Sequence, residues 1–502
     1  MLERPVLGLG KTTSSSSACI VTSLGPNPDF EIALTERLNR KKASGLWPEL
    51  AIRQLASRHD LSSAAIAENR DFSTPHQLES HLHQMMPFFD HLKDKGLARY
   101  SSALNKEISF YPHHQCHASA AALMSPFEKC LILVIDGAGT KTIDSPDGHF
   151  EVKNFDLPND FPVKVGHEEH SIYLLDLTKE RDQLVCVGKS WQYFSRPNLG
   201  ERSVFSDGLG SFYEKSAEFI FGSKHDSGKV MGLAGFGGAS SVSSRREFFE
   251  WMNWSDAFTG GSKLDWEASG RFSLYADLAA TAQSHFEGYM LNLVTGLKRQ
   301  FPNIDHLIIT GGCALNCTTN WKLHQLGLFN EIYIPPFPGD ESVGLGSAVA
   351  KILEIPGPSA LNTLSHEKQK SFWGPEPTDD TSAKLEDIFS GFIIERPDSI
   401  TDHCAKLLSQ GKIIAWHQGR SETGPRALGH RSILADARIP DLKNILNAQI
   451  KFRESFRPYG CSVRHENAHK YFMVPMGFNN PFMSFAVPLK VFSRGQHHSL
   501  YH

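Results

Sequence analysis

Two histidines stand one helical turn apart in the segment YPHHQCHASA, residues 111–120. His113 and His117 occupy positions i and i+4, so on a helix both imidazoles project from one face and can bind a single ion. An isolated pair with this spacing is more often exposed or hydrogen-bonded than bound to a metal. A metal site therefore requires further ligands from elsewhere in the chain.

Two aspartates are candidates for these ligands. Asp136 follows the apolar stretch KCLILVI, and Asp340 ends the loop PPFPGD. Each has a neighbouring glycine, which lets the backbone approach a ligand closely. Two imidazoles with one or two carboxylates, and with coordination positions left open, suit Fe(II), Zn(II) or Mn(II) in a reactive site. Taken alone, each aspartate is equally well explained as a turn residue.

Two glycine-rich segments are candidates for phosphate binding. GGCALN contains Gly311, Gly312 and Asn316 and opens a predicted helix, whose free backbone amides attract anions. HDSGKVMGLAGFG places Lys229 among glycines, where its ammonium could meet a phosphate, although a surface loop is the alternative. Neither segment matches the phosphate loop of nucleoside triphosphatases or the dinucleotide fingerprint. A nucleotide site would therefore be of another type.

Basic residues are concentrated between positions 411 and 460, where nine basic and four acidic residues occur in a chain of net charge −4. The planar fork of arginine suits bidentate binding of phosphate or carboxylate. Aromatic residues are sparse here and no groove-reading helix is apparent, so we expect a small phosphorylated substrate and no nucleic acid. A solvated basic face is the alternative. The candidate ligands are Arg420, Arg426, Arg431, Lys451, Arg453 and Arg457.

Alternating strands and helices are predicted to position these residues. Apolar segments at 305–310 and 331–334 read as strands, and each is followed by a helical segment, at 314–326 and 341–353. This alternation predicts a parallel sheet in an α/β fold, with GGCALN and PPFPGD at the carboxyl ends of strands, where ligands bind. Further strands are expected within 6–22, 129–135 and 412–417, and further helices within 47–56, 113–124, 212–222, 275–301 and 399–410.

The length and composition limit the class of protein. A chain of 502 residues has room for about two to four domains, and the Pro-, Ser- and Thr-rich segment 356–381 is the expected boundary. The small net charge provides no general attraction for nucleic acid or membranes. The sequence has no apolar stretch of roughly 18 residues and no export signal, so we expect a cytoplasmic protein without a membrane partner. The eight scattered cysteines are expected to be reduced.

Several motifs together resemble the O-carbamoyltransferases of nodulation-factor and antibiotic biosynthesis. They occur in family order over nearly the whole chain, as HHQCH, VIDGAG, GSFYEKSAEFIFGSKHDSGKVMGLAGFG, ITGGCALN, PPFPGDESVGLGSA, GRSETGPRALGHRSILAD and IKFRESFRP. The resemblance implies an actin-like, ASKHA-type ATPase unit at residues 1–360, similar to the tRNA threonylcarbamoyl-transferase. It also implies a YrdC-like α/β domain at residues 373–502.

The resemblance also implies an activity. Family members use ATP and carbamoyl phosphate to make carbamoyl-adenylate and pass the carbamoyl group to a hydroxyl of a small-molecule acceptor. By this resemblance His113, His117, Asp136 and Asp340 surround a divalent iron, and Lys42 reaches the same catalytic site. The arginine-rich segment would bind carbamoyl phosphate and nucleotide, chiefly through Arg426, Lys451 and Arg457. GGCALN and Lys229 would lie near the nucleotide phosphates.

The sequence departs from the family pattern at three places. KTTSSSSA stands where the family has a His-Asp pair, FRPYGCS replaces an FRPFAPS-like run, and the chain ends without a TGxPxLLNTSFN-like segment. We therefore expect a truncated C-terminal domain. One alternative is a nucleotide- and metal-binding homologue without full activity. Another is a metal-dependent hydrolase or phosphotransferase on the same fold. The sequence predicts neither the acceptor nor the oligomeric state.

Overall fold

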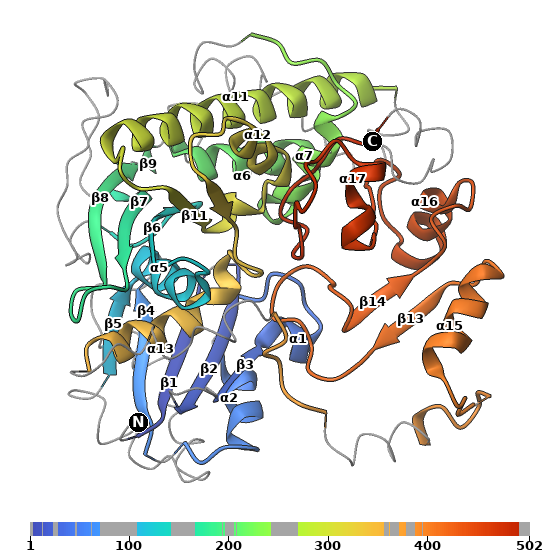
Figure 1. The fold of residues 1–502 in the computed structure, drawn as a ribbon, viewed down its shortest axis with the longest axis horizontal. Coiled ribbons are helices and arrows are strands. Elements are labelled where there is room, and N and C mark those ends of the chain that lie inside the picture. Colours follow the sequence, from blue (N-terminus) through green and yellow to red (C-terminus); the bar gives the residue numbers. More distant parts are fainter. Residues whose placement is uncertain are drawn as a thin grey trace. The chain divides into compact units, whose positions relative to one another are not determined.

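The computed structural model describes residues 4–70, 108–141, 166–241, 270–355, 361 and 371–490, except for positions 13, 24–28, 46–47, 62, 193, 196–204, 207, 378–386 and 394. The chain divides into two compact units, Met1–Lys370 and Ser371–His502 (Figure 1). The predicted domains, 1–360 and 373–502, stay a prediction, because this division does not show that either part folds alone. The expected linker, 356–381, lies mostly outside the described residues.

A five-stranded sheet begins the first unit, with its strands in the order β3-β2-β1-β4-β5. Its members are β1 (Val6–Lys11), β2 (Ser16–Ser23), β3 (Asp29–Leu34), β4 (Ala65–Arg70) and β5 (Ile108–Pro112). The first three strands form an antiparallel meander, whereas β4 and β5 run parallel to β1. Two helices follow β3, α1 (Thr35–Asn39) and α2 (Glu49–Ala56). The strands predicted within residues 6–22 are confirmed as β1 and β2.

A second sheet repeats this topology in the order β12-β11-β6-β7-β8. Its members are β6 (Lys129–Ile135), β7 (His167–Asp176), β8 (Leu184–Gln192), β11 (His306–Thr310) and β12 (Glu331–Tyr333). Here β6, β7 and β8 form the antiparallel meander, and β11 and β12 join parallel to β6. The unit is therefore a duplicated α/β fold of the predicted actin-like kind, although no repeat is visible in the sequence. A short pair, β9 (Phe194–Ser195) and β10 (Phe205–Ser206), is also present.

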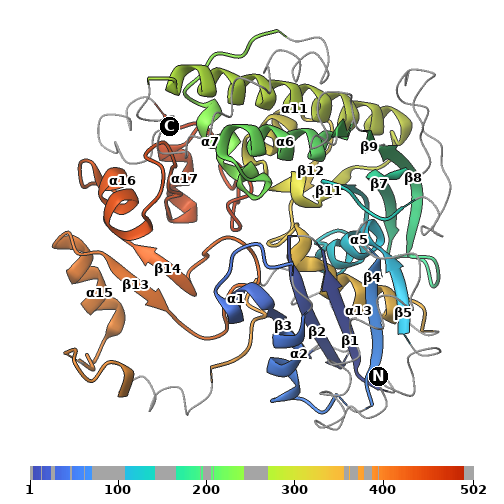
Figure 2. The same cartoon turned by 180° about the vertical axis from the view of Figure 1, so that it is seen from behind.

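Two buried helices lie between the sheets, α5 (His113–Met124) and α13 (Val343–Leu353) (Figures 1 and 2). They pack against each other, with α13 also on β1 and α5 also on β6. Small side chains allow this close packing. A Cβ added to Gly346 would lie 1.9 Å from the carbonyl oxygen of Cys116, which is far inside van der Waals contact. The glycine thus fixes the distance between the two helices.

The other helices of the first unit surround the second sheet. They are α6 (Leu209–Phe221), α7 (Ser227–Ala234), α11 (Phe272–Gln300) and α12 (Cys317–Gln325), with the 3₁₀ turns η2 (Lys224–Asp226), η3 (Gly312–Leu315) and η4 (Asp340–Ser342). Helix α6 ends at Gly222, whose φ of 77° suits glycine. The loop reading of residues 225–237 is wrong, because most of the segment forms η2 and α7.

The second unit contains short elements. They are α15 (Ile400–Ser409), β13 (Ile414–His417), β14 (Arg431–Leu434), α16 (Leu442–Ile445), the π-helical turn η6 (Leu446–Lys451), η7 (His465–Asn467) and α17 (Ala468–Tyr471). Ser399 caps α15, because its hydroxyl accepts a hydrogen bond from the amide of Asp402. β13 and β14 pair antiparallel. Across the described ranges, every helix is too short or too polar to cross a bilayer. All eight cysteines are free thiols, as predicted.

Candidate active site

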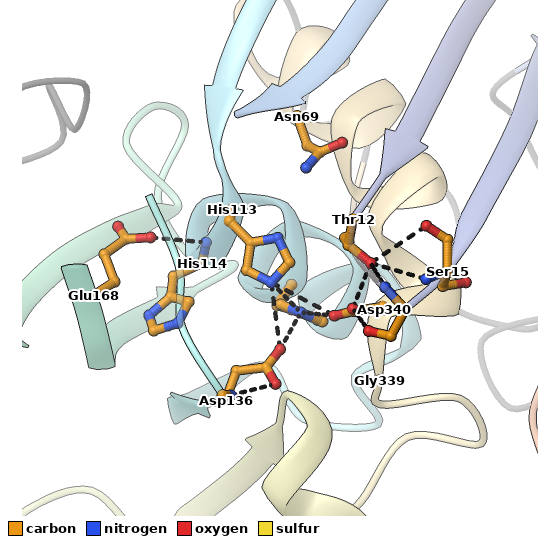
Figure 3. Close-up of polar contacts among 12 residues, drawn as sticks. Thr12, Ser15, Asn69, His113, His114, Asp136, Glu168, Gly339 and Asp340 are labelled. Atoms are coloured by element: carbon orange, nitrogen blue, oxygen red, sulfur yellow. Dashed lines mark hydrogen bonds and ion pairs between the residues drawn. The ribbon is translucent and has the colours of Figure 1, made fainter. Parts of the chain in front are cut away.

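The first turn of α5 presents the two predicted histidines. The amide of His113 donates a hydrogen bond to the Thr140 hydroxyl at 2.7 Å. The amide of His114 donates to a carboxylate oxygen of Glu168 at 3.3 Å (Figure 3). Amides in the first turn of a helix have no partner within the helix, so these acceptors satisfy them. The negative charge of Glu168 also interacts favourably with the positive end of the helix dipole. The start of α5 is therefore anchored to neighbouring segments.

The structure brings the four predicted metal ligands together. Nε2 of His113 lies 3.3 Å from Oδ2 of Asp136 and 3.6 Å from Oδ1 of Asp340. Nε2 of His117 lies 3.0 Å and 3.5 Å from the same two oxygens. Figure 3 shows His113, Asp136 and Asp340 pointing toward a common centre. One ligand atom from each of the four residues lies within 4.8 Å of the others, which fits one ion at roughly 2 Å from each.

The charges of these groups reinforce one another. Burial by itself lowers the pKa of His117, but hydrogen bonds and charges from Asp136 and Asp340 outweigh burial and raise it to about 9. Burial raises the pKa of Asp136, yet the two imidazoles outweigh it and hold this pKa well below its usual range. Asp136 is thus favoured in the ionised form that binds metal. A divalent cation would take the place of the proton held by the imidazoles.

Hydroxyl groups orient the outer atoms of the ligands. Ser342 donates to the carbonyl of Gly339 at 2.8 Å, so its oxygen accepts from Nδ1 of His117 at 3.2 Å. This leaves Nε2 of His117 for a metal. The hydroxyls of Thr12 and Ser14 lie 2.6 Å and 2.8 Å from Oδ2 of Asp340, which leaves Oδ1 facing the imidazoles. Such outer hydrogen bonds are typical of metal centres. The donor set and its supports therefore fit a divalent metal.

A buried ion pair supports the same site from β7 and β8. Glu168 and Lys189 form an ion pair in which both side chains are 0% exposed. Glu168 also accepts a hydrogen bond from the amide of Thr140 at 2.9 Å. The pKa of Glu168 is lowered to about 2, because the charges of Lys189 and His114 and the hydrogen bonds to the carboxylate outweigh the effect of burial. One carboxylate therefore holds both the start of α5 and the segment after Asp136.

The predicted glycine turn lies directly against Asp136. Gly311 has a φ of 90°, and an added Cβ would lie 2.2 Å from the carbonyl oxygen of Ile135. A Cβ on Gly312 would lie 2.8 Å from Oδ1 of Asp136. Asn316 caps α12, accepting from the amide of Thr319 at 3.1 Å. The two glycines thus lie against the end of β6 and Asp136, whereas Asn316 caps the next helix. Phosphate binding by the three residues stays a prediction.

The two predicted lysines differ in their surroundings. Nζ of Lys229 lies 2.7 Å from a carboxylate oxygen of Asp226 and is largely buried, so its charge is balanced within the protein. Lys42 lies near His225, whose pKa is lowered by burial and by the charges of Lys224 and Lys42. Lys42 therefore lies in a cationic neighbourhood beside η2. Roles for both lysines in the reaction stay predictions.

Two predicted arginines of the second unit bind protein groups. Nε of Arg420 donates to the carbonyl of Gly374 at 2.7 Å, and Nε of Arg431 donates to Glu422 at 3.0 Å. Glu422 also accepts from backbone amides, and these hydrogen bonds outweigh burial and lower its pKa. Both guanidinium groups therefore stabilise the turns between β13 and β14. Their binding of phosphate stays a prediction.

Three other basic residues lie close together. The pKa of Lys451 is lowered, first by burial and then by the charges of Arg453, Arg457 and Arg431. Arg453 donates to Asn447 at 2.8 Å, which fixes its direction. Arg426 makes no hydrogen bond or ion pair with the described residues. Cationic side chains that lie this close to one another are expected where a polyanion binds.

Several residues at the site are absent from the sequence prediction. Glu214 is the most informative, because its carboxylate lies against Gly137, with Oε1 3.0 Å from the position of an added Cβ. Thr12, Ser14 and Glu168 were also missed. Helical spacing was the available signal for Glu214, since it lies four residues after Gly210 on one face of α6. No local pattern pointed to the hydroxyls or to the buried ion pair.

The chain matches two models of one protein family. Residues 88–349 match the model described as Carbamoyltransferase N-terminus, and residues 405–502 match Carbamoyltransferase C-terminus. The first match alone spans more than half of the chain. The chain belongs to the carbamoyltransferase family. The four clustered ligands therefore lie within the residues that match the family's N-terminal model, and the resemblance seen in the motifs is confirmed.

Relatives of this chain show what it is similar to. It is 30% identical to nodulation protein NolNO of Sinorhizobium fredii, over 91% of its own length and 64% of the relative. It is 31% identical to the 3'-hydroxymethylcephem-O-carbamoyltransferase of Streptomyces clavuligerus, over 49% of its own length and 46% of the relative. Full-length HypF in a phosphate- and nucleotide-bound form aligns with a TM-score of 0.39 at 13% identity, covering 71% of this chain and 57% of HypF. The chain thus spans less than two thirds of NolNO.

Proposed function

We propose that this protein is an ATP-dependent O-carbamoyltransferase. In the proposed reaction, carbamoyl phosphate, ATP and one water give carbamoyl-adenylate, phosphate and pyrophosphate, because water first releases phosphate from carbamoyl phosphate and the resulting carbamate then displaces pyrophosphate from ATP. The carbamoyl group then passes to a hydroxyl of a sugar or another natural product, and AMP is released. The observation that carries this proposal is the convergence of His113, His117, Asp136 and Asp340 within a sequence of the carbamoyltransferase family.

The clustered ligands support a role in the transfer step. The two imidazoles and two carboxylates would hold Fe(II) or another divalent ion, which when bound would act as a Lewis acid toward the carbamoyl oxygen. Ser342, Thr12 and Ser14 orient the ligands through hydrogen bonds to atoms that face away from the centre. The low exposure of the histidines, 2% for His113 and 0% for His117, limits water at the reacting group.

The basic residues of the second unit support a role in activation. Carbamoyl phosphate and ATP are anions, and the positive charges around Lys451 would provide the attraction that they need. The pKa of Lys451 is lowered first by burial and then by these charges. Arg426, Lys451 and Arg457 are the proposed phosphate ligands. In this proposal the second unit is a YrdC-like domain that makes the adenylate. The first unit, with Lys42 and Lys229, then binds the adenylate and transfers the carbamoyl group in the cytoplasm.

Separate assays of the two steps test the proposal. The full chain is loaded with Fe(II) and incubated with ATP and carbamoyl phosphate, and pyrophosphate release is measured against a reaction without carbamoyl phosphate. Pre-formed carbamoyl-adenylate is then supplied with 3'-hydroxymethylcephem and with simple sugars as acceptor probes. Transfer in the second assay without pyrophosphate in the first would identify a homologue that has lost activation. Failure of both assays would reject the proposed function.

A further inference from the structure

Glu214 lies beside the metal ligands because α6 packs tightly on the turn after β6. A Cβ added to Gly210 would lie 2.2 Å from the carbonyl oxygen of Asp136, so the backbone of α6 touches this turn. Residue 214 follows one helical turn later on the same face. Both of its carboxylate oxygens lie within 3.3 Å of the Cβ position of Gly137. The packing thus directs Glu214 over the residue that follows the ligand Asp136.

The carboxylate of Glu214 is not engaged by the described part of the protein. It makes no hydrogen bond or ion pair with those residues, unlike Asp136 and Asp340, which are bound by imidazoles and hydroxyls. The side chain is partly accessible, so a small molecule can reach it. It also lies outside the group of four that can contact one ion. Glu214 therefore provides a carboxylate that is available to a substrate.

The surrounding charges keep this carboxylate ready to take up a proton. Burial raises the pKa of Glu214, and the charges of Asp136 and Asp340 raise it further, to about 7. Lys224 on η2 and Lys215 on α6 itself act in the opposite direction. A group with a pKa near the working pH is effective in general acid–base catalysis. This property supports a role that the position of the side chain already suggests.

We propose that Glu214 is the general base that accepts the proton of the acceptor hydroxyl, an inference that rests on the proposed function. The hydroxyl proton moves to a Glu214 oxygen as the hydroxyl oxygen forms a bond to the carbamoyl carbon. The bond between that carbon and the adenylate phosphate oxygen breaks, and its electron pair leaves with AMP. The products are the carbamoylated acceptor, AMP and protonated Glu214.

Other candidate bases at the site are less suitable. His113 and His117 direct their Nε2 atoms at the carboxylates, and Asp340 is held by two hydroxyls. Glu341 also has a raised pKa, mainly through burial, but its Oε1 is sealed from solvent without a hydrogen-bond partner. The described residues of the turn between β1 and β2 supply only hydroxyls. Glu214 thus combines access with an unengaged carboxylate.

Variants of α6 test this inference. Glu214→Gln keeps the shape of the side chain but removes its basicity, and Glu214→Asp keeps a carboxylate. Glu218→Gln is the matched control, because Glu218 lies one turn later on α6 and pairs only with Lys215 at the surface. All are loaded with Fe(II) and given pre-formed carbamoyl-adenylate, with 3'-hydroxymethylcephem, simple sugars or water as acceptor. AMP release, carbamoylated product and bound iron are measured.

We expect Glu214→Gln to lose about 100-fold or more in carbamoyl transfer, the usual effect of removing a general base. Bound iron should remain unchanged, Glu214→Asp should recover part of the rate, and Glu218→Gln should match the native chain. A transfer rate of Glu214→Gln within about threefold of the native rate would overturn the inference but leave the proposed function standing. Loss of iron would make Glu214 a metal ligand instead. Glu341→Gln is assayed in the same way, and a loss confined to that variant would assign the role to Glu341. Native protein that carbamoylates none of the probes would reject the proposed function, and the inference with it.

Discussion

Ser14 shows how a single hydroxyl supports the candidate centre. Its oxygen donates to Oδ2 of Asp340 at 2.8 Å, so Oδ1 is left for the ion. We expect Ser14→Ala to weaken the affinity for Fe(II) or Zn(II) by about 10-fold, the lower end of the effect of outer-shell partners. Ser16→Ala is the matched control, because the Ser16 hydroxyl has no partner among the described residues. Equal affinities for both variants, measured by competition with a chelator, would contradict this role.

His114 gives the first unit a pH dependence of known sign. Burial is the main reason that its pKa falls to about 3, so the folded protein keeps the ring neutral. The unfolded chain takes up this proton near pH 6.5, and the group's contribution to stability is therefore complete above pH 6.5 and lost toward pH 3. Between pH 7 and pH 5 this loss amounts to about 2 kcal/mol.

Urea unfolding at the two pH values measures this effect. We expect His114→Gln to show a smaller decrease in stability between pH 7 and pH 5 than the native chain, because glutamine does not titrate. The absolute stability of the variant is not the readout, since it also loses the contact of Nδ1 with Ser171 at 2.8 Å. An equal decrease in both proteins would show that His114 takes up its proton in the folded state as readily as in the unfolded chain.

At the scale of elements, the site depends on the contact between α5 and α13. α5 carries both histidines, and α13 directly follows η4, which carries Asp340. We expect Gly346→Ala to force these helices apart, because its Cβ would meet the Cys116 carbonyl oxygen at 1.9 Å. Overpacking of this kind costs about 1–3 kcal/mol. The variant should also bind metal more weakly, since the ligands would separate.

A second glycine provides the control for that prediction. Gly296 lies in α11, and an added Cβ there would meet nothing within 4 Å. Gly296→Ala should therefore leave metal binding unchanged and raise stability by about 0.5–1 kcal/mol, the helix preference of alanine over glycine. Thermal unfolding and metal titration of the two variants compare them directly. Equal stability and equal metal affinity of the two variants would show that the contact between α5 and α13 does not control the site.

The helices and strands that carry the metal ligands could be predicted from sequence, whereas two strands of the second sheet could not. α5 and β6 each contain an unbroken run of small or apolar residues, so periodicity and apolar runs identify them. β7 begins at His167 and continues with Glu168, Glu169 and His170, which are buried although they are polar. Lys189 on β8 balances one of these charges, and such pairing across strands leaves no local signal. The glycines of 225–237 likewise obscured the helix α7.

At the scale of the whole molecule, the duplicated sheet explains where the ligands meet. The two sheets share one topology, and α5 and α13 pack together between them. No repeat in residue types marks this duplication, because strand order depends on burial patterns that many sequences satisfy. The sequence predicted all four ligands, two from the HxxxH spacing and Asp136 and Asp340 as candidates beside glycines. Only the three-dimensional packing shows that they meet and places the missed Glu214 beside them.

A crystal structure of the full chain grown with Fe(II) without oxygen would test the central claim most directly, through anomalous diffraction at the iron edge. We predict one peak in the first unit, at about 2.0–2.2 Å from Nε2 of His113 and His117 and from one oxygen each of Asp136 and Asp340. A peak bound by other residues would contradict this account. So would direct hydrogen bonds between these imidazoles and carboxylates that persist with iron in excess.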